Sequence, residues 1–187
     1  MFRQLFRRGL PCLLLFLAAC ATGPTIESNY DHGVNFAAYR TFGYFSPLGT
    51  DKSGYATLVT QTLKAATRRE MEARGYTYSD SNPDLLLNFN GKLARQVEVS
   101  QIPMGPPMGY YGYRGGFYGG WGGYYTNVDQ YTEGTLNIDL VDAQRRQLVW
   151  EGVAIGRVTE KHRETREAAI NAAVAEIFKK FPFHATP

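Results

Sequence analysis

Cysteine is nearly absent from this 187-residue sequence, which contains only Cys12 and Cys20. Because both lie near the N-terminus, the rest of the chain has no thiol that could form a disulfide, bind a metal or act as a nucleophile. We therefore expect a fold that is stabilised by its hydrophobic core and not by covalent or metal cross-links.

A long hydrophobic run is also lacking. The apolar run from Leu10 to Ala19 has about half of the ~20 residues that a transmembrane helix needs. It follows three arginines with no acidic residue and ends in small side chains, a pattern that is typical of a secretory signal peptide. Residues 1–19 are therefore predicted to be a signal peptide that is removed.

The end of this segment is more specific. Leu17-Ala18-Ala19-Cys20 resembles the bacterial lipoprotein signal, in which the cysteine becomes the first mature residue and carries lipid. Cys20 is thus the predicted lipidation site and the contact with the membrane, and a signal peptide with an incidental cysteine is the alternative. The residue after Cys20 is Ala21 and not the aspartate that would favour retention in the inner membrane. We therefore expect the protein to be located in the outer membrane. Residues 20–28 would form a tether, and the domain would face the periplasm.

The chain also has no excess of positive or negative charge once the predicted signal peptide is removed. The chain has 20 basic and 17 acidic residues, and three of the basic residues lie in the signal (Arg3, Arg7 and Arg8). The mature chain is therefore balanced, which gives no indication of a nucleic-acid partner.

The remaining residues have enough apolar content for one domain, which we place at 29–187. Alternating and helical patterns of apolar residues predict strand, helix, strands and helix in that order. The predicted elements are a strand at 35–45, a helix at 55–74, a strand at 84–90 that can extend to Val99, strands at 131–143 and 147–159, and a helix at 164–180. This order predicts an α+β fold: a mainly antiparallel sheet of about four to five strands packed against two helices.

Residues 103–125 differ from the rest of the chain because glycine, tyrosine and proline dominate them and Arg114 is their only charge. The segment has no helical or strand period, so we expect a flexible insertion between two strands. Exposed aromatic rings can stack on sugars, other rings or the lipid interface, and arginine can join by cation–π contact. The predicted partner-binding residues are Tyr110, Tyr111, Tyr113, Arg114, Phe117, Tyr118, Trp121 and Tyr124; a loop without a partner is the alternative.

Several motifs together resemble a known family of bacterial lipoproteins, the domain-of-unknown-function family numbered 4136. They are Phe36-x-x-Tyr39-x-Thr41-Phe42, Asp84-Leu85-Leu86-Leu87-Asn88, Tyr131-x-Glu133-Gly134-Thr135-Leu136-x-Ile138-x-Leu140-x-Asp142, Val149-Trp150-x-Gly152 and Phe181-Pro182. The resemblance covers roughly Ile26 to Pro182. It implies an envelope lipoprotein with an α+β domain and no established activity, so it supplies no catalytic residues.

Residues that could support catalysis are few. The three histidines, His32, His162 and His184, are not in a metal-ligand spacing. Glu133 and Glu151 could face each other across a hairpin and act as an acid/base pair, although solvated strand residues or partners of Arg145 and Arg157 are the simpler interpretation.

We therefore expect a non-catalytic lipoprotein that has no cofactor and no metal, with an envelope protein or peptidoglycan as its partner. Two alternatives stay open. One is an enzyme that acts on envelope glycans through Glu133 and Glu151, and the other is a small-ligand carrier with a pocket near Trp150.

Overall fold

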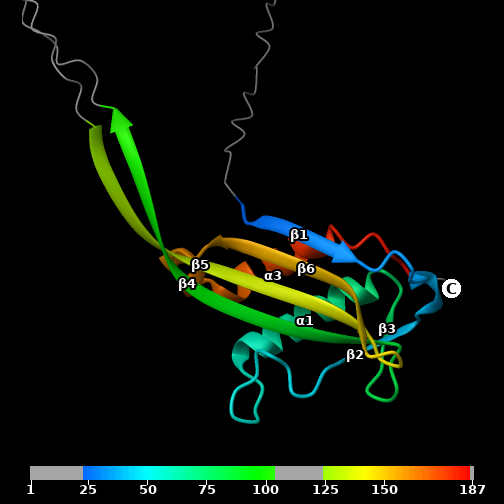
Figure 1. Ribbon diagram of the computed structural model, residues 1–187. Coiled ribbons are helices and arrows are strands. Elements are labelled where there is room, and N and C mark those ends of the chain that lie inside the picture. Colours follow the sequence, from blue (N-terminus) through cyan, green and yellow to red (C-terminus); the bar gives the residue numbers. More distant parts are fainter. Residues whose placement is uncertain (1–22, 104–123, 186–187) are drawn as a thin grey trace, which may run out of the picture.

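The computed structural model describes residues 23–103 and 124–185, which form an α+β domain with one sheet and one layer of helices (Figure 1). The predicted α+β class is confirmed, but within these described residues the sheet is mixed and has six strands, and there are three α-helices instead of two. The elements are β1 (Thr25–Tyr30), a 3-10 helix (Phe36–Ala38), β2 (Thr41–Tyr44), α1 (Leu58–Glu72), β3 (Thr77–Tyr78), β4 (Leu85–Pro103), β5 (Tyr124–Asp142), β6 (Gln147–Arg157), α2 (Glu160–Glu164) and α3 (Arg166–Phe178).

The strand order is β1-β6-β5-β4-β2-β3. The first four strands pair antiparallel, whereas β2 pairs parallel with both β3 and β4. Parallel neighbours need a crossover, and α1 provides it between β2 and β3. The parallel edge was not predicted because β2 and β3 are only four and two residues long, too short for an alternating pattern.

Three predicted boundaries differ from the structure. Residues 35–45 form a strand only at Thr41–Tyr44, because the Asn35 side chain accepts a hydrogen bond from Ala37 N and caps the 3-10 helix before it. Residues 25–28, which we placed in the tether, belong to β1, an edge strand against β6. Strand β5 begins at Tyr124 and not at Tyr131.

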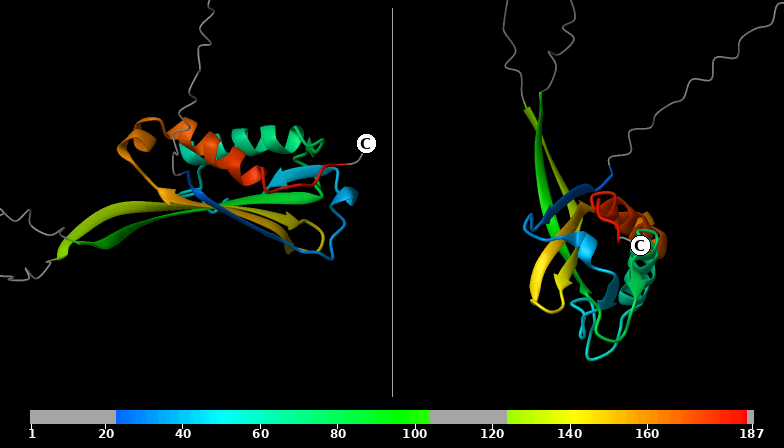
Figure 2. Two further views of the ribbon diagram at one scale, coloured as in Figure 1. Left: turned by 90° about the horizontal axis from the view of Figure 1, so that it is seen from above. Right: turned by 90° about the vertical axis from the view of Figure 1, so that its right-hand side faces the viewer.

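Helices α1 and α3 lie on one face of the sheet and leave the other face uncovered (Figure 2). Buried aliphatic and aromatic residues fill the space between the layers, and an aromatic cluster closes one end of it. Phe181 is central to that cluster: its ring centroid lies 5.1 Å from Trp150, 5.9 Å from Phe178 and 6.0 Å from Phe36.

The C-terminal helical segment is divided in two. We expected one helix over 164–180, but Thr165 adopts φ −108° and ψ 42°, which separates α2 from α3. Helix α3 buries Val174, Ile177 and Phe178 against the sheet. Among the described residues, no helix has the length and apolar character needed to cross a bilayer.

Candidate functional site

The hairpin of β4 and β5 continues well beyond the rest of the sheet. Each of the two strands has 19 residues, whereas β6 pairs with β5 only as far as Glu133, opposite Arg157. From Arg95 opposite Thr132 to Pro103 opposite Tyr124, β4 and β5 pair with each other alone. We name residues 95–103 and 124–132 the arm; it projects from the body of the domain (Figure 1).

The two faces of the arm differ in character. One face is an aliphatic stripe, in which Val97 and Val99 are each 59% exposed and Val128 is 54% exposed. Leu93, 71% exposed, extends this stripe at the base of the arm. Because side chains alternate along a strand, the stripe is on the same side of the sheet as the buried Phe89. The stripe therefore continues the face that carries the core, beyond the helices that cover it.

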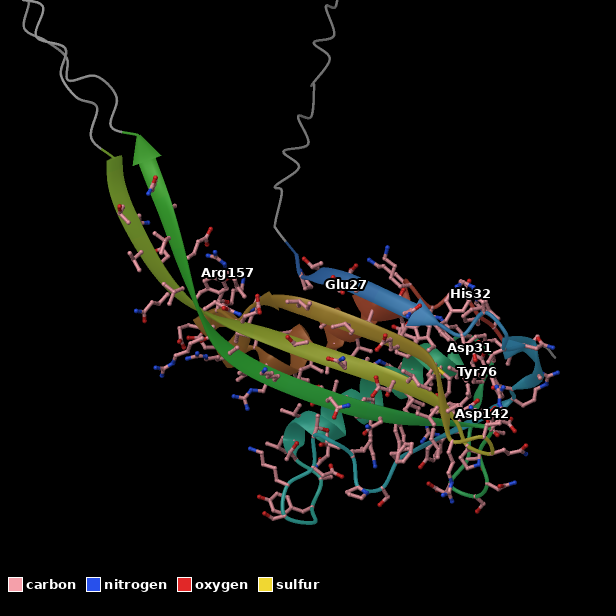
Figure 3. The ribbon with its side chains drawn as sticks, in the orientation of Figure 1. Glu27, Asp31, His32, Tyr76, Asp142 and Arg157 are labelled. Atoms are coloured by element: carbon pink, nitrogen blue, oxygen red, sulfur yellow. The ribbon has the colours of Figure 1, made fainter. Side chains whose placement is uncertain are left out.

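The opposite face of the arm is polar and is fastened to the sheet. Arg157 at the end of β6 forms an ion pair with Glu98 and lies 4.0 Å from the Tyr131 ring centroid (Figure 3). Gln96 donates a hydrogen bond of 3.1 Å to Glu133. These contacts hold the base of the arm against the end of β6 through its polar face.

Of the residues predicted to bind a partner, only Tyr124 belongs to the described part of the chain. Residues 110–121 of that set lie outside the described residues, as does Cys20. Tyr124 is part of β5, opposite Pro103. The segment 104–123 is thus connected to the two ends of the arm.

The uncovered face of the sheet carries a row of polar residues across four strands. Asn29 of β1 lies opposite Glu151 of β6, which lies opposite Asp139 of β5, which lies opposite Asn88 of β4. Gly49 N donates a hydrogen bond of 3.1 Å to Asn88 Oδ1. We name these four residues the polar row.

Asp139 is the most perturbed member of this row. Burial raises its pKa, the neighbouring Glu151 carboxylate raises it further, and a 3.2 Å hydrogen bond from Asn90 Nδ2 opposes the shift. Asp139 therefore accepts a proton more readily than an ordinary aspartate does.

The predicted Glu133–Glu151 pair is wrong. Glu133 lies opposite Arg157, and the cross-strand neighbour of Glu151 is Asp139. The prediction failed because the sequence shows that a hairpin exists but not which residues lie opposite each other. Asp142 points to the other side of the sheet from Asp139, because it lies opposite the buried Leu85.

The histidines occupy structural positions. His162 receives a hydrogen bond from the Thr159 backbone and completes the cap of α2. The His32 ring lies 4.2 Å from the ring of Tyr30, and His184 is exposed near the C-terminus. Within residues 23–103 and 124–185, no group of three or more potential ligands is placed to hold a metal ion.

Trp150 belongs to the core, with 1% of its surface exposed. A hollow of about 190 Å³ lies beside it, lined by Asn29, Tyr30, Asp31, Leu148, Val149, Trp150 and Glu151. This volume is below the roughly 300–1,000 Å³ of ordinary small-molecule sites, so it does not favour the ligand-carrier alternative.

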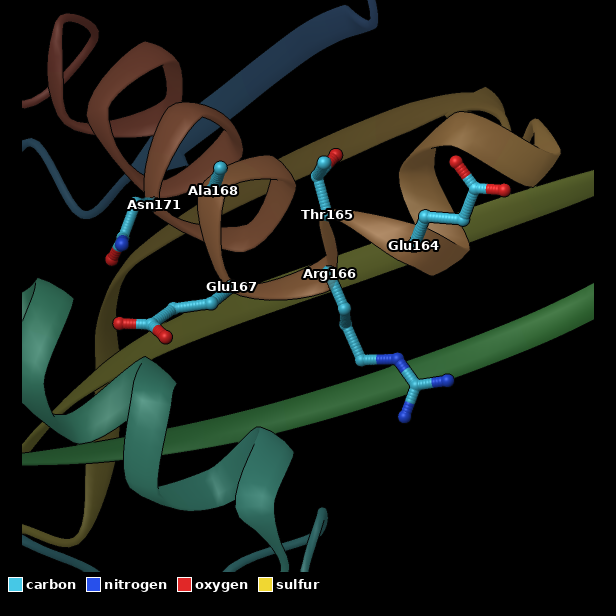
Figure 4. A pocket seen from close by; sticks show the side chains of 6 residues that line it. All are labelled: Glu164, Thr165, Arg166, Glu167, Ala168 and Asn171. Carbon is cyan, nitrogen blue, oxygen red and sulfur yellow. The ribbon is translucent and has the colours of Figure 1, made fainter.

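A second hollow, of about 360 Å³, lies at the start of α3 and is lined by Glu164, Thr165, Arg166, Glu167, Ala168 and Asn171 (Figure 4). Asn171 accepts a hydrogen bond of 2.8 Å from Arg69 of α1. In Figure 4 the Arg166 side chain points out from the start of the helix. The surface is shallow and polar, and nothing in its geometry identifies a ligand.

Sequence reasoning missed both the aliphatic stripe and the polar row. The stripe had a signal, because the alternation that begins at Leu85 continues through Val97 and Val99. The polar row had none, since it joins residues of four strands whose register only the folded sheet determines.

A sheet with one helical layer, an open polar face and a projecting hairpin defines the class as a two-layer α+β domain. The model of the family named Domain of unknown function (DUF4136) matches residues 26–183, and the chain belongs to this family. The resemblance recognised in the sequence is thereby confirmed.

Solved structures share the fold. A DUF4136 family protein from Bacteroides thetaiotaomicron has 20% identity and a TM-score of 0.52, over 87% of this chain and 98% of that chain. A PDZ domain protein from Parabacteroides distasonis has 13% identity and a TM-score of 0.57, over 86% of this chain and only 36% of that chain. At these identities the similarity concerns the fold alone. None of the curated proteins compared with the chain matches it significantly.

Proposed function

We propose that the protein is a lipoprotein of the bacterial outer membrane, anchored through Cys20, whose domain faces the periplasm and binds an envelope partner without catalysing a reaction. The observation that supports binding is the polar row on the uncovered sheet face. Side-chain amides both donate and accept hydrogen bonds, and carboxylates accept them. A row with two carboxylates in the middle and an amide at each end is complementary to the hydroxyl and amide groups of peptidoglycan.

The lipid anchor is tested by replacing Cys20 with serine in the producing cell. We expect the precursor to keep its signal peptide and to disappear from the outer-membrane fraction, because the oxygen of serine cannot receive the lipid. A Cys20→Ser protein that is still processed after residue 19 and still found in outer-membrane vesicles contradicts the proposal.

Peptidoglycan binding is tested by co-sedimentation of the purified protein with isolated cell-wall sacculi. Asn88→Ala and Glu151→Ala should each lower the bound fraction several-fold. Glu72→Ala is the matched control, since Glu72 is exposed on α1 in the helical layer. Equal binding by all three variants would show that the polar row does not contact the cell wall.

The predicted aromatic contacts need a separate variant. Replacing residues 104–123 with an Asn-Gly turn removes most of the predicted rings while the arm strands can still pair. Crosslinking in intact cells, followed by mass spectrometry, should then lose a protein partner that the native chain captures. Identical crosslinks in both proteins would exclude these rings as the contact.

A glycan hydrolase is the second candidate, with Asp139 and Glu151 in place of the predicted Glu133–Glu151 pair. It is favoured by the raised pKa of Asp139 beside a second carboxylate, an arrangement in which one group can act as acid and the other as base. Native protein that releases no muropeptides from sacculi would contradict it. If release is seen, Asp139→Asn and Glu151→Gln should abolish it.

A further inference from the structure

The aliphatic stripe of the arm has no covering layer among the described residues. Its three arm residues, Val97, Val99 and Val128, are more than half exposed, and Val99 and Val128 lie directly opposite each other. β-branched residues on both strands of an isolated ribbon place apolar area in water, which is unfavourable unless another surface covers it.

The charges of the arm are distributed unequally between its faces. Glu98 and Asp129 lie on the polar face, as does Glu133 just before the arm, by the alternation of the paired strands. Arg95 is the only charged residue of the described arm that shares a face with Val97 and Val99, and it is exposed. The same face also carries the uncharged Gln101, Thr126, Gln130 and Thr132. It therefore combines an aliphatic stripe with a cation and no carboxylate, the chemistry that suits an anionic lipid surface.

The arm also extends from the end of the sheet at which the chain enters. Thr25, the first residue of β1, shares a row across the sheet with Ile155, Thr135 and Lys92. From Lys92 to Pro103, the end of β4, the strand advances about 36 Å at about 3.3 Å per residue. The chain between Cys20 and Thr25 can reach about 18 Å at most.

This comparison rests on the proposed lipid anchor. If Cys20 is held at the membrane, Thr25 lies within about 18 Å of it. The stretch of β4 from Lys92, beside Thr25, to the tip of the arm at Pro103 is about twice as long as that tether. We propose that the arm lies on the phospholipid leaflet that holds the anchor, with the stripe of Leu93, Val97, Val99 and Val128 turned to the lipid. The polar face, with Glu98 and Asp129, faces water.

The depth of the contact follows from the backbone. The Thr132 carbonyl still accepts a hydrogen bond from Val158 N. Further along the arm, the outer edges of β4 and β5 have no partner strand among the described residues, so their N–H and C=O groups need water or headgroups as hydrogen-bond partners. Unpaired strand edges are not tolerated in the hydrocarbon interior. The arm therefore rests at the level of the headgroups and the first methylenes and does not cross the membrane.

The sequence has no cysteine after Cys20, and the proposed lipid blocks the thiol of Cys20 itself. A cysteine introduced into the arm is therefore the only thiol that a label can reach in the mature protein. A single cysteine is introduced as Val99→Cys or, as the matched control, as Ser100→Cys, the adjacent exposed position on the other face. The full lipidated protein is labelled with an environment-sensitive fluorophore. It is then reconstituted in vesicles of phosphatidylethanolamine and phosphatidylglycerol that carry a nitroxide on the acyl chain.

We expect fluorescence at position 99 to be quenched about twofold or more beyond that at position 100, because only the stripe meets the lipid. A nitroxide near the headgroup should quench more than one near the chain end. Equally weak quenching at both positions, in protein that stays on the vesicles, would overturn the inference and leave the anchor intact. Protection of position 99 from aqueous iodide without lipid quenching would also overturn it, since a second protein copy would then cover the stripe.

A failure of the anchor gives a different result. Protein that does not remain with the vesicles on flotation contradicts the lipid on Cys20 and, with it, the membrane-facing arm. A further variant, Val97→Asn with Val99→Asn, should stay on the vesicles through the lipid while fluorophore quenching from position 128, introduced as Val128→Cys, falls. Unchanged quenching at position 128 in this variant would show that the stripe does not determine the contact.

Discussion

The hydroxyl of Tyr39 donates a hydrogen bond of 2.8 Å to Asp142 Oδ2 and thereby connects the segment before β2 to the last residue of β5. Asp142 also accepts hydrogen bonds from the backbone N and from Nε of Arg145, at 2.7 Å and 2.9 Å. Burial alone would raise the pKa of Asp142, but these donors and the Arg145 charge outweigh it and hold the pKa at about 2. The folded state is thus stabilised by the charged form of the Asp142 carboxylate.

Stability is expected to fall in acid because of this site. The pKa of Asp142 in the folded protein is about 2, below the value of about 3.9 for an unfolded aspartate. The stabilisation is therefore fully present above about pH 4 and is lost as the pH falls from about 4 to 2. Asp84, whose pKa is lowered by hydrogen bonds from Arg40 and Thr41 despite burial, acts in the same direction. Urea unfolding at pH 7, 4 and 3 measures the loss; a constant free energy of unfolding would contradict this account.

Asp142→Asn should lower the free energy of unfolding by about 1 to 3 kcal/mol at pH 7, because Tyr39 and Arg145 lose a charged, buried acceptor. The variant should also show a smaller loss of stability between pH 4 and 3 than the native protein shows. Asp129→Asn is the matched control, since Asp129 is an exposed residue of the same strand. A loss of equal size in both variants would show that the Tyr39–Asp142 contact has no special role.

Asp139→Asn is expected to act in the opposite direction. The pKa of Asp139 is raised by burial and then by the Glu151 charge, so the folded state favours its protonated form. The stabilisation from this group is present at low pH and is lost as the pH rises through the folded pKa. Removing the charge should leave stability at pH 7 unchanged or higher by up to about 1 kcal/mol. A clear loss of stability at pH 7 in thermal unfolding would contradict this explanation.

Gly152→Ala should destabilise the fold, because a Cβ at position 152 would lie 2.4 Å from Ile177 Cγ2 and 2.5 Å from the Trp150 ring. Relief of this overlap requires a shift of α3 or of the indole, at about 1 to 3 kcal/mol. Gly91→Ala is the control, since a Cβ there meets no atom within 4 Å. Denaturant midpoints for the two variants measure the difference, and equal midpoints would show that α3 adjusts freely.

Phe181→Ala tests the aromatic cluster at the end of the core. Phe181 is 2% exposed and packs against Trp150 and Phe178, so truncation should cost about 3 to 5 kcal/mol. Leu148→Ala should cost less than about 1 kcal/mol, because Leu148 is 48% exposed. Thermal unfolding followed by near-ultraviolet circular dichroism reports both variants; a loss below about 1 kcal/mol for Phe181→Ala would contradict a central role for this ring.

Local patterns were sufficient for the longer elements. The alternation of Leu136, Ile138 and Leu140 predicted a half-buried strand, and the apolar spacing of Ile170, Val174 and Ile177 predicted a helix; both are present. These patterns are readable because each element buries one face against the same core. The family was likewise recognised from short motifs that contain core residues such as Phe42 and Trp150.

What the sequence by itself determined is the α+β class, the hairpin of β5 and β6, the C-terminal helical pattern and the family, since all depend on contacts or periods within short segments. Only the tertiary structure decided which residues face each other across strands. It placed Asp139 and not Glu133 beside Glu151, added β1 and the parallel edge to the sheet, and left Val97 and Val99 uncovered. The physical reason is that strand register and coverage depend on partners distant in the chain, and a one-residue shift moves a side chain to the opposite face.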